Sequence, residues 1–128
     1  NYPDRKTSCL IGRWSSKVSS QYTHYPRPQD SGNHEDVTEV TLTNKEGKGI
    51  RVTAIDRPFS FSALYYTVDD IYKATHDCDL KPRKEIILSL DAAVLGLGNS
   101  SCGPGVLKKY AIDKQKPHTL RVRFSLIK

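Results

Sequence analysis

The chain has 128 residues, of which 37% are hydrophobic, and it carries a formal net charge of +6. This length fits one domain, and a chain of this size buries roughly two-thirds of its unfolded surface, enough for a hydrophobic core. A membrane span is excluded because no apolar run reaches about 18 residues, and no charged-then-apolar signal peptide is visible.

The first part of the chain predicts extended segments separated by one polar loop. Residues 9–22, CLIGRWSSKVSSQY, are expected to be extended and to form a strand, with Trp14 as a packing anchor. Residues 25–36 are rich in proline, glycine and polar side chains, which predicts a loop. Within residues 36–55, two alternating segments flank the polar turn NKEGKG, and this pattern predicts a β-hairpin.

A strand followed by a short helix is predicted in the middle of the chain. The strand, residues 58–66, alternates between two faces. One of these faces carries Phe59, Phe61 and Ala63. The helix TVDDIYKAT begins at Thr67, and the spacing Thr67-x-x-Asp70 resembles a capping box in which Asp replaces the usual Glu or Gln.

Two further strands are predicted in the last part of the chain. Residues 85–95 place three apolar side chains on one face: Ile86, Leu88 and Leu90. Residues 118–127 alternate apolar and polar positions, as a half-buried antiparallel strand does, with Leu120, Val122, Phe124 and Leu126 on the apolar face. Together the elements predict an all-β fold in one domain, residues 1–128: an antiparallel β-sandwich with one short helix near residues 68–75.

The stretch LGLGNSSCGPGV, residues 95–106, is the strongest candidate for a functional loop. It holds four of the eight glycines and one of the three cysteines. A nucleotide cradle does not fit, because Ser101 stands where a dinucleotide fingerprint needs its third glycine and no Gly-Lys-Ser/Thr follows. Cys102 as a nucleophile lacks a base tied to it by local sequence. A loop aimed at a ligand and a tight structural bend both remain open.

Metal and nucleic-acid sites have little support in the sequence. The three cysteines and four histidines form no CxxC, HxxxH or HExxH pattern. The basic residues are scattered, with no run of five, so only the net charge motivates a nucleic-acid-binding domain. The neighbouring carboxylates Asp69 and Asp70 are explained by capping of the helix. The residues alone therefore indicate a β-rich binding or accessory domain.

Three stretches, in this order, resemble the end of the β-galactosidases of glycoside hydrolase family 2. They are NYPDR at residues 1–5, the glycine-rich stretch at 95–106 and the closing HTLRVRFSL at 118–126. Arg13-Trp14 and Thr75-His76 match further steps of the family pattern. The resemblance covers essentially the whole chain and implies the C-terminal half of the family's last domain, a large supersandwich of the galactose-mutarotase-like type. The start at Asn1 rather than Met likewise indicates a piece of a longer protein.

The resemblance also implies an activity for the whole enzyme, which would hydrolyse terminal β-D-galactose residues with retention. The family's two catalytic glutamates lie upstream in a barrel, so the chain is expected to hold no catalytic residue and to be inactive alone. No cofactor is expected in this fragment, because full-length relatives bind magnesium and sodium or potassium through residues outside it. The implied partners are a galactoside, the remaining domains and, as an open point, further copies in a homo-oligomer. Neither nucleic acid nor a membrane is expected as a partner, and the compartment is left open between cytoplasm and periplasm.

In the family, the glycine loop lines the mouth of the galactose site, where several members present a Trp. This chain departs from that pattern, since its only Trp is Trp14. The resemblance therefore implies a smaller substrate contact, made by Asn99, Ser101, Cys102 and Gly103. In the NYPDR motif, Asp4 and Arg5 are expected to pair with neighbours and hold a loop rather than contact substrate. The alternative reading is a stand-alone carbohydrate-binding β-sandwich without catalysis.

Overall fold

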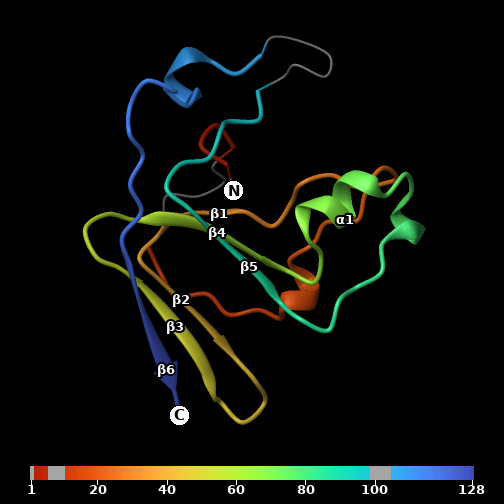
Figure 1. Ribbon diagram of the computed structural model, residues 1–128, viewed down its shortest axis with the longest axis vertical. Coiled ribbons are helices and arrows are strands. Elements are labelled where there is room, and N and C mark those ends of the chain that lie inside the picture. Colours follow the sequence, from red (N-terminus) through yellow and green to blue (C-terminus); the bar gives the residue numbers. More distant parts are fainter. Residues whose placement is uncertain (1, 6–10, 99–104) are drawn as a thin grey trace.

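The computed structural model describes residues 2–5, 11–98 and 105–128. Within these ranges the chain forms two three-stranded antiparallel sheets and one α-helix (Figure 1). Short 3-10 helices occur at η1 (Val18–Ser20), η2 (Asp77–Asp79) and η3 (Lys108–Tyr110). The predicted all-β fold with two antiparallel sheets and one short helix is confirmed.

The first sheet, sheet A, contains β1 (His34–Val37), β4 (Phe59–Leu64) and β5 (Ile87–Asp91) in the order β1-β4-β5. The register of β4 and β5 is regular, with Ser62 opposite Ser89. Because side chains alternate along a strand, Phe59 and Phe61 share one face with Leu88 and Leu90, and the serines share the other. The first face is therefore apolar along β4 and β5, whereas the second combines the serines with Leu64 and Ile87.

The second sheet, sheet B, contains β2 (Glu39–Thr43), β3 (Gly49–Ala54) and β6 (Val122–Ile127) in the order β2-β3-β6. β2 and β3 form the predicted hairpin. The side-chain oxygen of Asn44 holds its turn by accepting hydrogen bonds from the backbone N–H groups of Glu46 (2.9 Å) and Lys48 (3.0 Å). β6, from the far end of the sequence, pairs with β3 along its whole length, so the last strand is essential to this sheet.

The hydrophobic core lies where the apolar faces of the two sheets meet. Its buried centre is formed by Val40 of β2, Val52 of β3 and Phe59 of β4. A second cluster holds the helix against the end of β4, and its buried members are Tyr22, Leu64, Ile71, Ala74 and Leu80. The sandwich therefore has one main core and a smaller one beside the helix.

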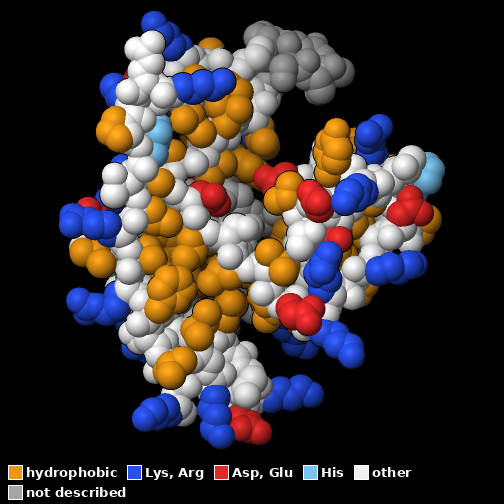
Figure 2. Space-filling view, viewed as in Figure 1, with side chains coloured by type: hydrophobic (Ala, Val, Ile, Leu, Met, Phe, Trp, Pro, Cys, Tyr) orange, Lys and Arg blue, Asp and Glu red, His pale blue; other side chains and the backbone are white. Residues whose placement is uncertain are grey.

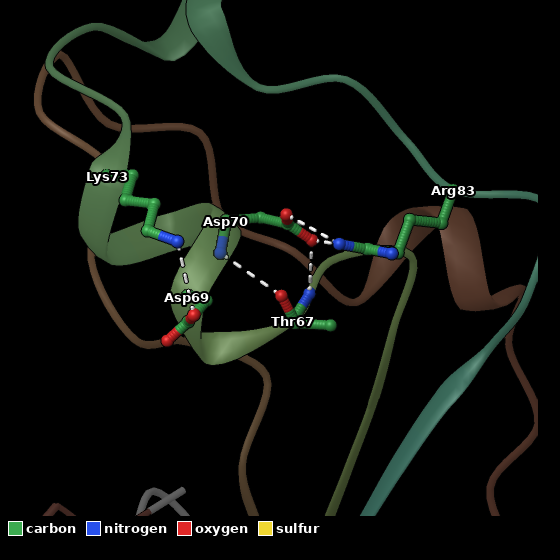
Figure 3. Close-up of polar contacts among 5 residues, drawn as sticks. All are labelled: Thr67, Asp69, Asp70, Lys73 and Arg83. Atoms are coloured by element: carbon green, nitrogen blue, oxygen red, sulfur yellow. Dashed lines mark hydrogen bonds and ion pairs between the residues drawn. The ribbon is translucent and has the colours of Figure 1, made fainter.

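The helix α1 (Val68–Lys73) is fixed by the predicted capping box, and Figure 3 shows its contacts. The Thr67 hydroxyl accepts from the Asp70 N–H at 3.1 Å, and an Asp70 carboxylate oxygen accepts from the Thr67 N–H at 2.8 Å. Arg83 donates to the same carboxylate from two nitrogens, at 2.6 and 2.8 Å. The Arg83 guanidinium and the Thr67 N–H hold the pKa of Asp70 well below its usual range. A six-residue helix is too short to be stable alone, so these bonds and Ile71 anchor it.

The prediction for the segment around Trp14 is wrong. From residue 11 to residue 17 no strand forms, and η1 is the regular structure that follows. The Trp14 side chain is 74% exposed and lies against Gly12 rather than in a core. The physical reason is that a strand needs a neighbouring strand for its backbone groups, and residues 11–17 pair with neither sheet.

The apolar face of sheet B is covered only in part. Near sheet A its side chains are buried, whereas Phe124 and Leu126 of β6 are 60% and 78% exposed. The register places Phe124 opposite Val52 and Leu126 opposite Ile50, so all four lie on one face. Figure 2 shows hydrophobic side chains gathered over this sheet. The predicted alternation of β6 is present, but half of its apolar face is uncovered in this chain.

Candidate functional site

Two motifs that lie far apart in the sequence meet in the structure. The carboxylate of Asp4 accepts hydrogen bonds from the backbone N–H groups of Leu97, at 2.9 Å, and Gly98, at 2.7 Å. The guanidinium of Arg5 donates to the carbonyl oxygen of Gly98 at 2.7 Å. Neighbouring residues of the NYPDR motif thus bind both the N–H and the carbonyl group of one glycine. The expectation that Asp4 and Arg5 hold a loop is confirmed.

The Asp4 carboxylate is well placed to stay ionised. Its side chain is only 7% exposed, and each of its oxygens receives one N–H. The hydrogen bonds from Gly98 and Leu97, with the nearby Arg5 charge, hold the pKa of Asp4 below its usual value. Hydrogen bonds to an ionised acceptor are stronger than those between neutral groups. Asp4 is therefore a firm attachment point for the backbone of residues 97 and 98.

The backbone around Gly96 and Gly98 leaves no room for side chains. Gly98 has a φ of +64°, and a Cβ there would lie 2.7 Å from the nitrogen of Val106. A Cβ on Gly96 would lie 2.9 Å from the carboxyl carbon of Asp4. Residues 96–98 are thus enclosed by Asp4 on one side and by residues 105–106 on the other. We call this arrangement of Asp4, Arg5, residues 96–98 and residues 105–106 the loop base.

The four predicted substrate contacts, Asn99, Ser101, Cys102 and Gly103, lie outside the described residues. They belong to the segment between Gly98 and Gly105, whose two ends the loop base brings together. Sequence reasoning singled out both NYPDR and the glycine-rich stretch but did not connect them. A signal for their connection was present, since both motifs are among the three stretches that carry the resemblance.

Gly98→Ala is expected to destabilise the loop base more than Gly47→Ala destabilises the β2–β3 turn. Both glycines have positive φ, +64° and +81°, so an alanine pays the left-handed backbone strain of about 1–2 kcal/mol at each. Only at Gly98 does the new Cβ also meet backbone, whereas Gly47 has nothing within 4 Å. Amide hydrogen exchange at residues 96–98 and 45–49 measures both effects. Equal acceleration of exchange in the two variants would show that the loop base is not tightly packed between residues 98 and 106.

Within the described part of the chain, no group of three or more His, Cys, Asp and Glu side chains gathers closely enough to hold a metal ion. No helix of the described ranges is long and apolar enough to cross a membrane.

The chain matches, over residues 1–126, the protein family described as "Beta galactosidase small chain". It is 34% identical over 116 residues to a β-galactosidase of Kluyveromyces lactis, an alignment that covers 90% of this chain and 11% of that protein. It is also 34% identical over 128 residues to the β-galactosidase BgaC of Bifidobacterium adolescentis, covering 98% of this chain and 12% of the relative. A β-galactosidase of an Arthrobacter species is 31% identical over 128 residues, with 96% and 13% covered. The chain thus spans about an eighth or less of the length of these relatives.

Proposed function

Since the chain belongs to the β-galactosidase small-chain family, we propose that it is the C-terminal part of an enzyme that hydrolyses terminal β-D-galactose residues with retention. It forms one domain unit, residues 1–128, of the last sandwich of a glycoside hydrolase family 2 enzyme. The match over residues 1–126 supports this assignment, and the small share of each relative supports a role as one part of a larger enzyme. The bond-breaking carboxylates of the retaining reaction lie outside the chain in this proposal.

The role of the chain in that enzyme is to hold residues 99–104 at the galactose site. The observation that carries this role is the loop base, where Asp4 and Arg5 bind the backbone of Leu97 and Gly98. A loop that is ordered before the substrate arrives loses less conformational entropy on binding, and its contacts are correctly placed for the reaction. In this proposal Asp4 and Arg5 are positioning residues, and Asn99, Ser101, Cys102 and Gly103 contact the sugar.

The exposed part of sheet B supports the proposal that more of the enzyme packs against this chain. Phe124 and Leu126 are large apolar side chains, 60% and 78% exposed, on a face whose other end is buried. Soluble proteins rarely leave a contiguous apolar patch of this kind uncovered, and such patches mark contact surfaces. The rest of the polypeptide is the proposed partner of this face.

The proposed function is tested by assaying the whole polypeptide and the purified 128-residue chain with a chromogenic β-galactoside. The whole polypeptide is expected to hydrolyse this substrate. Its first product should be the β-anomer of galactose, as retention requires, and NMR of the fresh product detects which anomer is released. The chain alone is expected to show no turnover. A whole polypeptide that binds galactosides without hydrolysing them would favour the stand-alone carbohydrate-binding function instead.

Cys102→Ala in the whole enzyme is expected to raise the KM for a β-galactoside several-fold and to leave kcat nearly unchanged. A thiol is small and a weak hydrogen-bond donor, so its contact with a sugar is worth only about 1 kcal/mol. Thiol labelling with and without a galactose-type inhibitor gives an independent readout. Cys78, which is exposed on η2 and far from the loop in sequence, is the internal control and should label equally in both conditions. If the inhibitor does not protect Cys102 from labelling and the kinetics of Cys102→Ala are unchanged, Cys102 does not contact the sugar.

A further inference from the structure

A groove with a cavity volume of about 550 Å³ lies on the face of sheet A that points away from the main core. Its floor is formed by β4 and β5, and its walls are formed by α1 and by the loop of residues 28–33. Figure 2 shows the molecule hollowed between the sheets and the part that carries α1. Neither the loop base nor the predicted substrate contacts account for this groove.

The floor of the groove carries a polar row. Ser62 of β4 lies opposite Ser89 of β5, and Asp91 follows two positions further along β5 on the same face. Asp30 enters from the wall loop, and its carboxylate accepts a hydrogen bond from the Tyr2 hydroxyl at 2.9 Å. The groove therefore places two serine hydroxyls and two carboxylates along one side.

Asp91 is the member of this row that most needs a partner. It is half-buried, and although its backbone pairs with Ser60 of β4, its carboxylate makes neither a hydrogen bond nor an ion pair with the described residues. Burial, together with the negative charge of Asp30, raises the pKa of Asp91. A partly buried carboxylate without a donor has lost hydration without replacing it, so a ligand that donates hydrogen bonds there is favoured.

Apart from the polar side chains of Gln29 and Asn33 in the wall loop, the remaining lining of the groove is apolar or aromatic. This part of the lining includes Tyr66, which follows β4, Ile71 and Tyr72 of α1, and Ile87 of β5. Of the described residues that line the groove, none is Lys or Arg, although the whole chain has a net charge of +6. Two carboxylates without a basic neighbour repel anions, so phosphate, sulfate and acidic ligands are disfavoured.

We propose that this groove binds a neutral saccharide unit. A sugar presents hydroxyl groups around its rim and C–H groups on its ring faces, which matches a row of acceptors beside aromatic and aliphatic walls. Asp91 and Asp30 accept hydrogen bonds from sugar hydroxyl groups, Ser62 and Ser89 complete the polar side, and Tyr72 covers a ring face. A volume of about 550 Å³ lies within the size range of small-molecule sites. The choice of a galactoside as the saccharide rests on the proposed function.

The test uses the whole enzyme with methyl-labelled isoleucine and the non-hydrolysed probe isopropyl 1-thio-β-D-galactoside. The δ1 methyl signals of Ile71 and Ile87, which line the groove, are expected to shift in a saturable way. Ile55 does not line the groove, so its methyl signal is the internal control. Asp91→Asn is expected to weaken the titration about ten-fold or more, because a hydrogen bond to a charged acceptor becomes a neutral one.

Two further variants make the result decisive. Asp69→Asn makes the same chemical change on an exposed carboxylate of α1 that pairs with Lys73, and it should leave the titration unchanged. Tyr72→Ala alters a side chain that is 84% exposed, so it can weaken binding without unfolding the chain.

The proposal would be overturned if the signals of Ile71 and Ile87 do not shift, or if the titration is unchanged in both Asp91→Asn and Tyr72→Ala. A carbodiimide cross-link from Asp91 to a lysine elsewhere in the enzyme would also overturn it, since the groove would then hold protein. The proposed function is tested separately by hydrolysis of a chromogenic galactoside, and that result does not depend on whether the groove binds a saccharide.

Discussion

Asp4→Asn in the whole enzyme is expected to lower kcat/KM for a β-galactoside about ten-fold or more while leaving the fold intact. The two oxygens of Asp4 accept from two backbone N–H groups, those of Leu97 and Gly98. An asparagine offers one oxygen and one NH2 group, so one of the two N–H groups would face another donor. The loop base would then open on one side, and the backbone of Leu97 and Gly98 would be held less firmly.

The control for this substitution is Asp69→Asn, which removes an equal charge from a side chain that is 78% exposed and pairs with Lys73. Steady-state kinetics and amide exchange at Leu97 and Gly98 are measured for both variants. Asp4→Asn should accelerate exchange at these two amides and lower kcat/KM, and Asp69→Asn should do neither. Identical kinetics in the two variants would show that the loop base does not position the substrate contacts.

The pH dependence of the loop base follows from the direction of the Asp4 shift. The folded-state pKa of Asp4 lies below its ordinary value of about 3.9. The stabilisation is therefore fully present above that ordinary value and is lost only as the pH falls through the lower, folded-state pKa. Between about pH 5 and pH 8, the stabilisation that the Asp4 carboxylate gives to Leu97 and Gly98 should not vary. Acceleration of exchange at these amides on acidification should be confined to the strongly acidic range.

Local patterns predicted the elements whose structure is determined locally. The β2–β3 hairpin was predicted from alternation and from a polar turn that includes Asn44 and Gly47, and the turn holds itself through the Asn44 side chain. The helix was predicted from Thr67 and Asp70, which bond to each other within one turn. Both predictions depended on residues close together in sequence, which is why a single sequence was sufficient.

Features that depend on distant partners could not be predicted from local patterns. The pattern around Trp14 predicted a strand, but residues 11–17 pair with neither sheet. The bonds from Asp4 to Leu97 and Gly98 join segments more than 90 residues apart. The groove likewise depends on the β4–β5 register, which puts Asp91 on the face opposite Leu90. Each of these features is decided by which segments meet, and alternation or spacing along one segment carries no information about that.

Leu126→Asp in the whole enzyme is expected to lower the free energy of unfolding by about 3 kcal/mol or more. Leu126 shares one face of sheet B with Phe124 and Ile50, and it is 78% exposed in this chain. If the rest of the enzyme covers this face, the substitution buries a carboxylate among apolar side chains. An unpaired charge there costs several kcal/mol or forces the interface apart.

Ser125→Asp is the matched control, because it places the same carboxylate on the neighbouring residue of the same strand. Side chains alternate along β6, so Ser125 lies on the opposite face, where its cross-strand neighbour is Arg51. That basic neighbour accommodates an added negative charge, so Ser125→Asp should change stability by a few tenths of a kcal/mol at most.

Both variants are measured by the midpoint of urea inactivation and by the retention of assembled enzyme on size-exclusion chromatography. Equal midpoints would mean that the face of Leu126 stays in water in the whole enzyme, and the exposed half of sheet B would then be a surface rather than a contact. A large loss for Leu126→Asp alone would show that a further part of the enzyme packs on this face of sheet B, since only a partner that excludes water can make the two neighbouring positions differ so strongly.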